Sequence, residues 1–313
     1  MRSLLQSMFL LLFATLLSPV VLADNIYKYQ DENGIWHFTD QAPGEKVDFE
    51  VVYMEKEREP RIKLRREGVN ENPVYLLFND FWGPVEVELS FEEAVNVLSE
   101  PPLPARFVVP GQTEQALLGI GALNEQLGFN YRLSMSSVPG APIEKLIEGL
   151  VILPPFAADE AYPVSQGFNG GTTHVTPDST YAVDIVMPVG TAIHAVRSGT
   201  VMDIEEDFNR GGTDFEKFAD KANHVRIVHE DGTMALYAHL DLASVEVRRG
   251  ARIRAGQKIA RSGNTGFSSG PHLHFAIQQN TGMRLISVPF QFRGPDGTTI
   301  TPQAKQLLRG VTP

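Results

Sequence analysis

The 313-residue sequence contains no cysteine. Disulfides, thiolate metal sites and cysteine nucleophiles are therefore excluded, and a transition-metal site would have to be built from histidine and carboxylate side chains. The sequence also lacks a surplus of positive charge. Its formal net charge of −11 at pH 7 argues against a surface that binds nucleic acid. Beyond the first residues no apolar run is long enough to cross a bilayer, so we expect no stable membrane span in the mature chain.

The first residues have the pattern of a secretory signal peptide. A basic Arg2 precedes an uncharged run from Met8 to Leu17, and Val21 and Ala23 occupy the −3 and −1 positions of a cleavage site. The alternative is an N-terminal membrane anchor, but the apolar run is short for a spanning helix. We therefore expect residues 1–23 to be removed and the mature chain to be exported.

Residues 25–40 read as two short aromatic strands joined by Asn33-Gly34, a dipeptide typical of a tight β-hairpin. With its Tyr-Lys, Asp-x-x-Gly and His-Phe-x-Asp pattern, this stretch resembles a small domain of unknown function found near the start of many exported proteobacterial proteins. The resemblance implies an envelope protein, and an envelope partner for this region is a hypothesis based on it. We assign residues 24–54 to this small domain and interpret His37 as a packing residue.

The next two segments are predicted to be a linker and an accessory domain. Residues 55–71 mix lysine and arginine with glutamate, which indicates a solvated linker or an exposed strand, with a patch for an anionic wall polymer as the alternative. In residues 72–152, short apolar runs are broken by frequent proline and glycine, a pattern typical of a β-sandwich. The capping-box sequence SFEE at Ser90 predicts the start of a helix, and residues 112–128 are a second helical candidate. We expect this domain to dock on, orient or cover the domain that comes after it in the chain.

Residues 155–289 alternate short strands with tight turns, so we expect a mainly antiparallel β domain there. The predicted fold class is therefore mainly β, with this domain preceded by a β-sandwich-like domain and a short N-terminal hairpin. A loop over residues 205–222 and the accessory domain are both candidates to shape or block its cleft. Residues 290–313 are interpreted as a polar C-terminal tail.

The candidate chemistry gathers around the sequence GPHLHF, which starts at Gly270. If it enters a buried strand, His272 and His274 share a face, because alternate strand residues do. Two imidazoles at one site suit a zinc centre, either as two ligands or as one ligand beside a base. Spacing alone does not assign roles among the candidate side chains, which are His174, Asp184, His239, His272 and His274, with His194, His224 and His229 as competitors.

Residues 166–277 resemble the lysostaphin-like, LytM-type zinc endopeptidases, which cut peptide bonds in peptidoglycan. The matching pieces are His174, AVDI around Asp184, P-x-G-T, YAHL around His239, GQ, SGNTG and GPHLHF. The resemblance implies that His174, Asp184 and His274 are the ligands of one Zn²⁺ ion, that His272 is the general base, and that His239 orients or stabilises the reacting oxygen. Nine residues separate His174 from Asp184, where the family commonly has three. On this interpretation the competing histidines belong to the strand framework (His224 and His229) or to the rim (His194).

These features predict an exported zinc metalloendopeptidase that hydrolyses peptidoglycan stem peptides or cross-links in the periplasm or envelope of a Gram-negative bacterium. One alternative is a zinc peptidase that acts on protein substrates in the same compartment. The other is a non-enzymatic, wall-binding regulator that keeps the fold and activates another hydrolase. Relatives of this last kind have usually lost ligands, and this sequence has kept them. Latency until the accessory domain moves is a further hypothesis.

Overall fold

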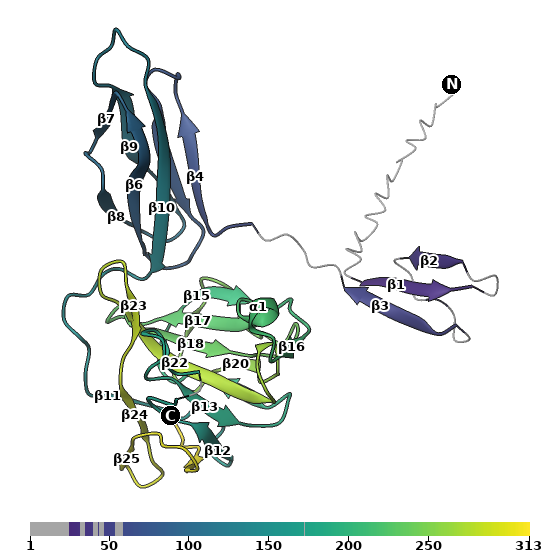
Figure 1. The fold of residues 1–313 in the computed structure, drawn as a ribbon. Helices are drawn as coiled ribbons and strands as arrows, with labels where there is room; N and C mark the ends of the chain where they lie inside the picture. Colours follow the sequence, from purple (N-terminus) through teal and green to yellow (C-terminus); the bar gives the residue numbers. More distant parts are fainter. Residues whose placement is uncertain (1–24, 32–34, 40–42, 44–46, 54–58, 172) are drawn as a thin grey trace, which may run out of the picture. The chain divides into compact units, whose positions relative to one another are not determined.

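The computed structural model describes residues 25–31, 35–39, 43, 47–53, 59–171 and 173–313. The chain divides into two units, residues 1–59 and 60–313 (Figure 1). In the first unit, an antiparallel sheet has the order β2–β1–β3, formed by β1 (Asn25–Gln30), β2 (Trp36–Thr39) and β3 (Phe49–Tyr53). The pairing of β1 with β2 confirms the predicted hairpin, and β3 adds a strand that the sequence did not predict. The signal peptide and the Asn33-Gly34 turn lie outside the described residues.

The second unit begins with two antiparallel sheets that share one apolar core, as expected for a sandwich. The first sheet has the order β10–β6–β8, with β6 (Val85–Val95), β8 (Ala105–Val109) and β10 (Asn130–Pro139). The second has the order β4–β5–β9–β7, with β4 (Ile62–Glu67), β5 (Val74–Asn79), β7 (Val97–Glu100) and β9 (Thr113–Ala122). We call residues 60–139 the accessory domain.

Two sequence expectations for this region were wrong. The SFEE motif at Ser90 lies inside β6, because the alternation of buried Val85, Val87 and Leu89 sets a strand period that overrides a local capping signal. The second helical candidate, residues 112–128, contains strand β9. In the segment interpreted as a solvated linker or an exposed strand, residues 62–67 form the largely exposed strand β4, which pairs with β5.

The remainder of the second unit is built on one nine-stranded sheet (Figure 1). Its strands have the order β19–β15–β17–β18–β22–β13–β12–β26, and β23 pairs with β22. They are β12 (Ala161–Gln166), β13 (Val183–Val186), β15 (Gly199–Glu205), β17 (His224–Val228), β18 (Met234–Ala238), β19 (Arg252–Ile253), β22 (His272–Asn280), β23 (Leu285–Ser287) and β26 (Leu307–Arg309). All pairings in this sheet are antiparallel, which confirms the predicted fold class.

Shorter elements surround the large sheet. A three-stranded sheet joins β11 (Leu150–Ile152), β24 (Phe290–Arg293) and β25 (Thr299–Ile300). Two-stranded pairs join β14 (Ala192–His194) to β20 (Lys258–Arg261) and β16 (Gly211–Gly212) to β21 (Gly266–Phe267). The single-turn helix α1 spans Phe215–Phe218. Among the described residues, no helix combines the length and the apolar character needed to span a bilayer.

The C-terminal residues are part of this domain, and their interpretation as a polar tail was wrong. Phe290 and Phe292 of β24 are buried in the main core, and β24 pairs with β11. Leu308 of β26 is also fully buried, and β26 pairs with β12, the first strand of the large sheet. The peptidase-like core therefore extends to residue 309 and does not end near residue 289.

The accessory domain is fixed to the far end of β22. The Glu86 carboxylate accepts hydrogen bonds from Asn280 Nδ2 at 2.8 Å and from the backbone N–H of Met283 at 2.6 Å, and Glu86 is buried. Asn280 lies six residues beyond His274 on this strand, which corresponds to about 20 Å. Further contacts between the two domains are the Arg61–Asp203 and Arg249–Asp80 ion pairs and the Trp82 N–H to Met202 carbonyl hydrogen bond.

Candidate metal centre

The two central strands of the large sheet bring the predicted carboxylate and histidine pair together. In the antiparallel register of β13 and β22, Asp184 lies opposite His274 and Val186 opposite His272. The intervening Leu273 and Phe275 are fully buried in the core. Strand alternation therefore places His272 and His274 on one face with Asp184, as the sequence pattern predicted.

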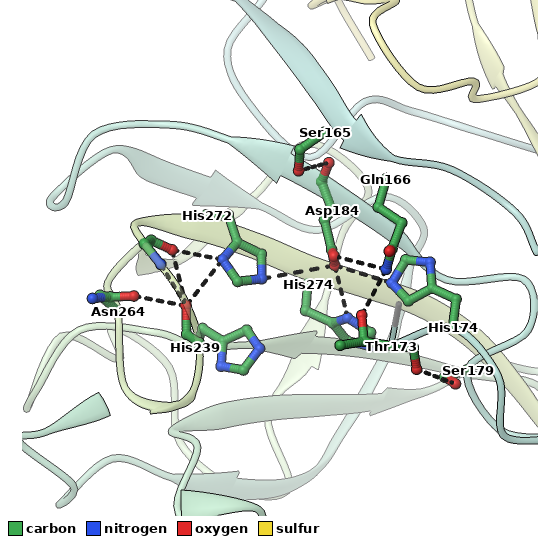
Figure 2. A network of polar contacts seen from close by, with 12 residues as sticks. Ser165, Gln166, Thr173, His174, Ser179, Asp184, His239, Asn264, His272 and His274 are labelled. Atoms are coloured by element: carbon green, nitrogen blue, oxygen red, sulfur yellow. Dashed lines mark hydrogen bonds and ion pairs between the residues drawn. The ribbon is translucent and has the colours of Figure 1, made fainter. Parts of the chain in front are cut away.

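Three donor atoms converge on one point of this face. Asp184 Oδ1 lies 3.2 Å from His174 Nε2 and 2.9 Å from His274 Nδ1, and Figure 2 shows both rings turned toward the carboxylate. The ligand atoms of these three residues all lie within 4.8 Å of one another. In a tetrahedral site with metal–ligand distances of about 2.0–2.1 Å, neighbouring ligand atoms are about 3.3 Å apart. The three side chains therefore fit a metal ion with an open fourth position.

The long loop before Asp184 still delivers His174 to the site. His174 Nδ1 donates a hydrogen bond to the carbonyl of Gly167 at 3.0 Å, which leaves Nε2 directed at Asp184. The His174 side chain is buried, and its backbone N–H bonds to the Gly170 carbonyl. The nine residues between His174 and Asp184 are accommodated because the chain turns back before β13 begins, where the Asn169 N–H bonds to the Thr180 carbonyl.

His272 and His239 lie beside the three donors, and each is oriented by a backbone carbonyl. His272 Nδ1 donates to the Gly270 carbonyl at 2.8 Å, and its Nε2 lies 3.7 Å from Asp184 Oδ1. His239 Nδ1 donates to the Thr265 carbonyl at 2.6 Å. Because a carbonyl only accepts, the proton of each neutral ring sits on Nδ1 and the Nε2 lone pair is free. The two ring centroids are 4.6 Å apart.

The electrostatics of the site favour an ionised Asp184 carboxylate. Burial acts to raise the pKa of Asp184, but hydrogen bonds from His174 and His274 outweigh it and hold this pKa well below its usual range. Burial acts to lower the pKa of His174, but the hydrogen bond to Asp184 outweighs it and raises this pKa. Burial, reinforced by His272 and His274, lowers the pKa of His239 to about 3. A cation is thus the electrostatic complement of the Asp184 cluster.

The other described histidines lie elsewhere. His37 stacks on Tyr29 and bonds to Asp31, and His224 on β17 lies 3.5 Å from Asp203. His229 bonds to the Ser198 carbonyl, and His194 is on β14. None of these four belongs to the cluster formed by His174, Asp184 and His274.

Sequence reasoning missed the residues that hold the candidate ligands in place. Gln166 Nε2 donates to Asp184 Oδ2 at 3.3 Å and to Thr173 Oγ1 at 2.6 Å. The turn at residues 165–171 and the C-terminal residues 301–304 line a cavity of about 540 Å³, and none of the lining side chains is ionisable. The cavity adjoins the site because Gln166 and Gly167, which contact Asp184 and His174, form part of its wall. In the sequence, the Gln166-Gly167 pair was the available sign of this support for Asp184 and His174.

The comparison with known proteins agrees with this geometry. Residues 178–284 match the family model of peptidase family M23, and this stretch contains Asp184, His239, His272 and His274. The chain contains an M23 peptidase domain. The M23 match begins four residues after His174, so the first candidate ligand lies just outside it. Residues 13–59 match a domain of unknown function, DUF4124.

Curated proteins similar to the M23 region include endopeptidases. Glycyl-glycine endopeptidase ALE-1 of Staphylococcus capitis is 35% identical over 120 residues, which cover 38% of this chain and 28% of that protein. Lysostaphin of Staphylococcus simulans is 32% identical over 147 residues (45% and 26%), and peptidoglycan DD-endopeptidase ShyA of Vibrio cholerae is 29% identical over 127 residues (39% and 26%). The chain thus matches little more than a quarter of the length of each relative.

Solved M23 structures are also similar to this region. The catalytic domain of the prophage-encoded M23 protein EnpA from Enterococcus faecalis has 24% sequence identity and a TM-score of 0.32, covering 44% of this chain and 92% of that one. Lysostaphin from Staphylococcus simulans has 30% identity and a TM-score of 0.29, covering 39% and 44%.

Proposed function

We propose that this protein is an exported zinc endopeptidase of the bacterial cell envelope that hydrolyses peptide bonds in peptidoglycan stem peptides or cross-links. The observation that carries the proposal is the convergence of His174, Asp184 and His274, with two more histidines beside them. Two imidazoles, one carboxylate and an open position are the donor set of catalytic zinc sites. The M23 domain and the peptidoglycan endopeptidases among its relatives support the same reaction and substrate class.

The chain's own residues have distinct roles in this reaction. A zinc ion held by His174, Asp184 and His274 would supply Lewis acidity toward a water molecule and the substrate carbonyl. His272 is the general base, because its Nε2 lone pair faces the site while its Nδ1–H is held by the Gly270 carbonyl. It accepts the proton of the attacking water and passes it to the leaving amine.

His239 has the same protonation pattern, so in the resting protein it accepts hydrogen bonds at Nε2 and does not donate them. We therefore assign it to orienting the attacking water, one of the two roles that the sequence left open. The uncharged cavity at residues 165–171 and 301–304 offers amide and hydroxyl groups beside the site, which suits the backbone of a peptide substrate.

The test combines metal content with digestion of purified sacculi by the mature protein, His272→Ala and Asp184→Ala. We expect about one zinc per wild-type chain and release of cleaved muropeptides, identified by mass. His272→Ala should keep its zinc and lose most of its cleavage, whereas Asp184→Ala should lose both, because it removes a ligand.

The other outcomes separate the alternatives. Zinc binding without cleavage of sacculi by the wild type would favour the regulatory alternative, and cleavage of unfolded proteins but not of sacculi would favour a protease. Absence of zinc from the wild type would overturn the ligand assignment.

A further inference from the structure

The loop over residues 206–222 makes backbone contacts with the stretch over residues 264–270, which begins within the SGNTG motif of residues 262–266. The carbonyl of Arg210 accepts a hydrogen bond from the Gly266 N–H, and that of Gly212 accepts one from the Ser268 N–H, both at 3.0 Å. These contacts form the parallel pairing of β16 with β21. Outside the backbone, the rings of Phe215 and Phe267 meet edge to face at 5.4 Å. We call residues 206–222 the clamp loop.

The stretch held by the clamp loop supplies both carbonyls that orient the two non-ligand histidines. Thr265 O accepts from His239 Nδ1, and Gly270 O accepts from His272 Nδ1. Ser268, whose N–H is bound by the clamp loop, also places its hydroxyl 3.3 Å from His272 Nδ1 and 2.9 Å from the Gly270 carbonyl. In Figure 2, Asn264, the first residue of this stretch, lies on the side of His272 away from Asp184.

The two backbones lie too close together for any side chain between them. A Cβ atom on Gly211 would come within 2.0 Å of the Asn264 carbonyl oxygen and 2.9 Å of that of Gly266. A Cβ on Gly266 would lie 2.7–2.9 Å from atoms of Ala222, at the other end of the clamp loop. Since backbone atoms cannot rotate away as a side chain does, a change at Gly211 must displace the 264–266 backbone.

A buried asparagine fixes the end of the clamp loop to the same stretch. Asn223 is fully buried, and its N–H donates to Thr265 Oγ1 at 3.1 Å. Its side chain exchanges two hydrogen bonds with Phe208, at 2.9 Å and 2.7 Å. The Thr265 hydroxyl in turn donates to the Leu240 carbonyl at 2.8 Å, beside His239.

His239 needs such support because its backbone is strained. Its φ of 61° lies in the left-handed region, which residues other than glycine rarely adopt without surrounding constraints. Without the Thr265 carbonyl, its proton would distribute between Nδ1 and Nε2, and the lone pair that faces the site would be lost in part of the molecules.

We propose that the clamp loop is a positioning device that fixes the orientation and tautomer of His239 and His272 by holding residues 264–270, with Gly211 as its closest contact. This inference rests on the proposed peptidase function. The loop thus acts through the catalytic histidines, in place of the cleft-blocking role that its length suggested.

The test compares Gly211→Ala with two other glycine substitutions in the full mature, zinc-loaded protein. Gly119→Ala in β9 is the control, because its Cβ would meet nothing closer than 3.9 Å. Gly212→Ala is the neighbouring comparison, because its Cβ would meet only the movable Phe218 ring. Zinc content, kcat and KM on a muropeptide substrate are measured, together with histidine tautomers from ¹⁵N NMR of selectively labelled protein.

We expect Gly211→Ala to lower kcat by about 10- to 100-fold, the usual effect of losing a group that orients an active-site residue, with zinc content and KM nearly unchanged. The His239 and His272 spectra should change from the Nδ1–H form to a mixture. Gly212→Ala should lower kcat much less, and Gly119→Ala should have the kcat and the histidine spectra of the wild type.

A folded Gly211→Ala protein with wild-type kcat and unchanged tautomers would overturn the proposal, as would a kcat loss explained by a parallel loss of zinc. If Gly211→Ala does not fold, Phe215→Ala provides the second test, since Phe215 is exposed and its loss loosens only the contact with Phe267. A lower kcat of Phe215→Ala then supports the proposal that the clamp loop positions the two histidines, whereas a raised KM with unchanged kcat contradicts it. If the wild type cleaves nothing, the peptidase function fails, while the tautomer comparison still tests the clamp.

Discussion

Replacing Phe292 by alanine tests whether the C-terminal strands belong to the core of the M23 domain. Phe292 is fully buried, and its ring lies 5.2 Å from that of Phe290 and 6.2 Å from that of Phe275, the residue after His274. Truncating a buried phenylalanine to alanine costs about 3–5 kcal/mol, including the cavity that remains. With a urea dependence of about 2 kcal/mol per molar, a loss of about 4 kcal/mol lowers the unfolding midpoint by about 2 M.

The assay must report on this domain alone, because the chain contains two units. Urea unfolding can be followed through the amide protection of β22, measured by pulsed hydrogen exchange at constant pH. Leu307→Ala is the matched control, since Leu307 is half exposed on β26 and its loss should change the free energy of unfolding by about 0.5 kcal/mol or less. If Phe292→Ala shifted the midpoint no more than Leu307→Ala, residues 290–313 would be a dispensable tail and would not belong to the core of the domain.

Two further predictions concern docking and pH. Glu86→Leu removes the carboxylate that accepts hydrogen bonds from Asn280 and Met283. The free energy of unfolding should fall by about 1–3 kcal/mol, and the connection between the domains should become more sensitive to protease. Sacculus cleavage should not change, because the contact is about 20 Å from His274, and a faster rate would revive the latency hypothesis. Burial lowers the pKa of His229 to about 4 in the folded protein. As the pH falls, His229 is therefore protonated in the unfolded chain at a higher pH than in the folded protein, and the free energy of unfolding should decrease between about pH 6.5 and 4. From pH 7.5 to 4.5 this residue should account for about 2.5 kcal/mol of lost unfolding free energy, and a His229→Gln variant measured by urea titration should lose correspondingly less over that range.

The sequence was a good guide where residue type and spacing determine geometry directly. Strand alternation was enough to place His272 and His274 on one face, and the resemblance to the LytM-type endopeptidases named the three members of the Asp184 cluster. The errors arose where a local signal competed with a longer pattern. The capping box at Ser90 lies within a Val-x-Val-x-Leu alternation that buries one face of β6. The alternation of Phe290 and Phe292 likewise outweighs the polar residues after it.

The clamp loop and the C-terminal strands could not be predicted because their partners are distant in sequence. Nothing near Gly211 reveals that its backbone will lie against that of Asn264. Similarly, β26 is only three residues long, too short for a periodic pattern, and its pairing with β12 places Leu308 in the core. Contacts of this kind depend on topology, and a periodic pattern within one segment carries no information about them.

The pairing of β12 with β26 also has a consequence for the order in which this domain can be completed during synthesis. The first strand of the M23 domain finds its edge partner only in the last strand of that domain, so the sheet cannot be completed while residues 307–309 are still unsynthesised. Long-range pairing of this kind forms late in folding. An unfinished or prematurely terminated chain would carry every residue of the candidate metal site, but it would leave β12 without this edge partner. The order of the strands therefore makes completion of the large sheet depend on its last strand to be synthesised.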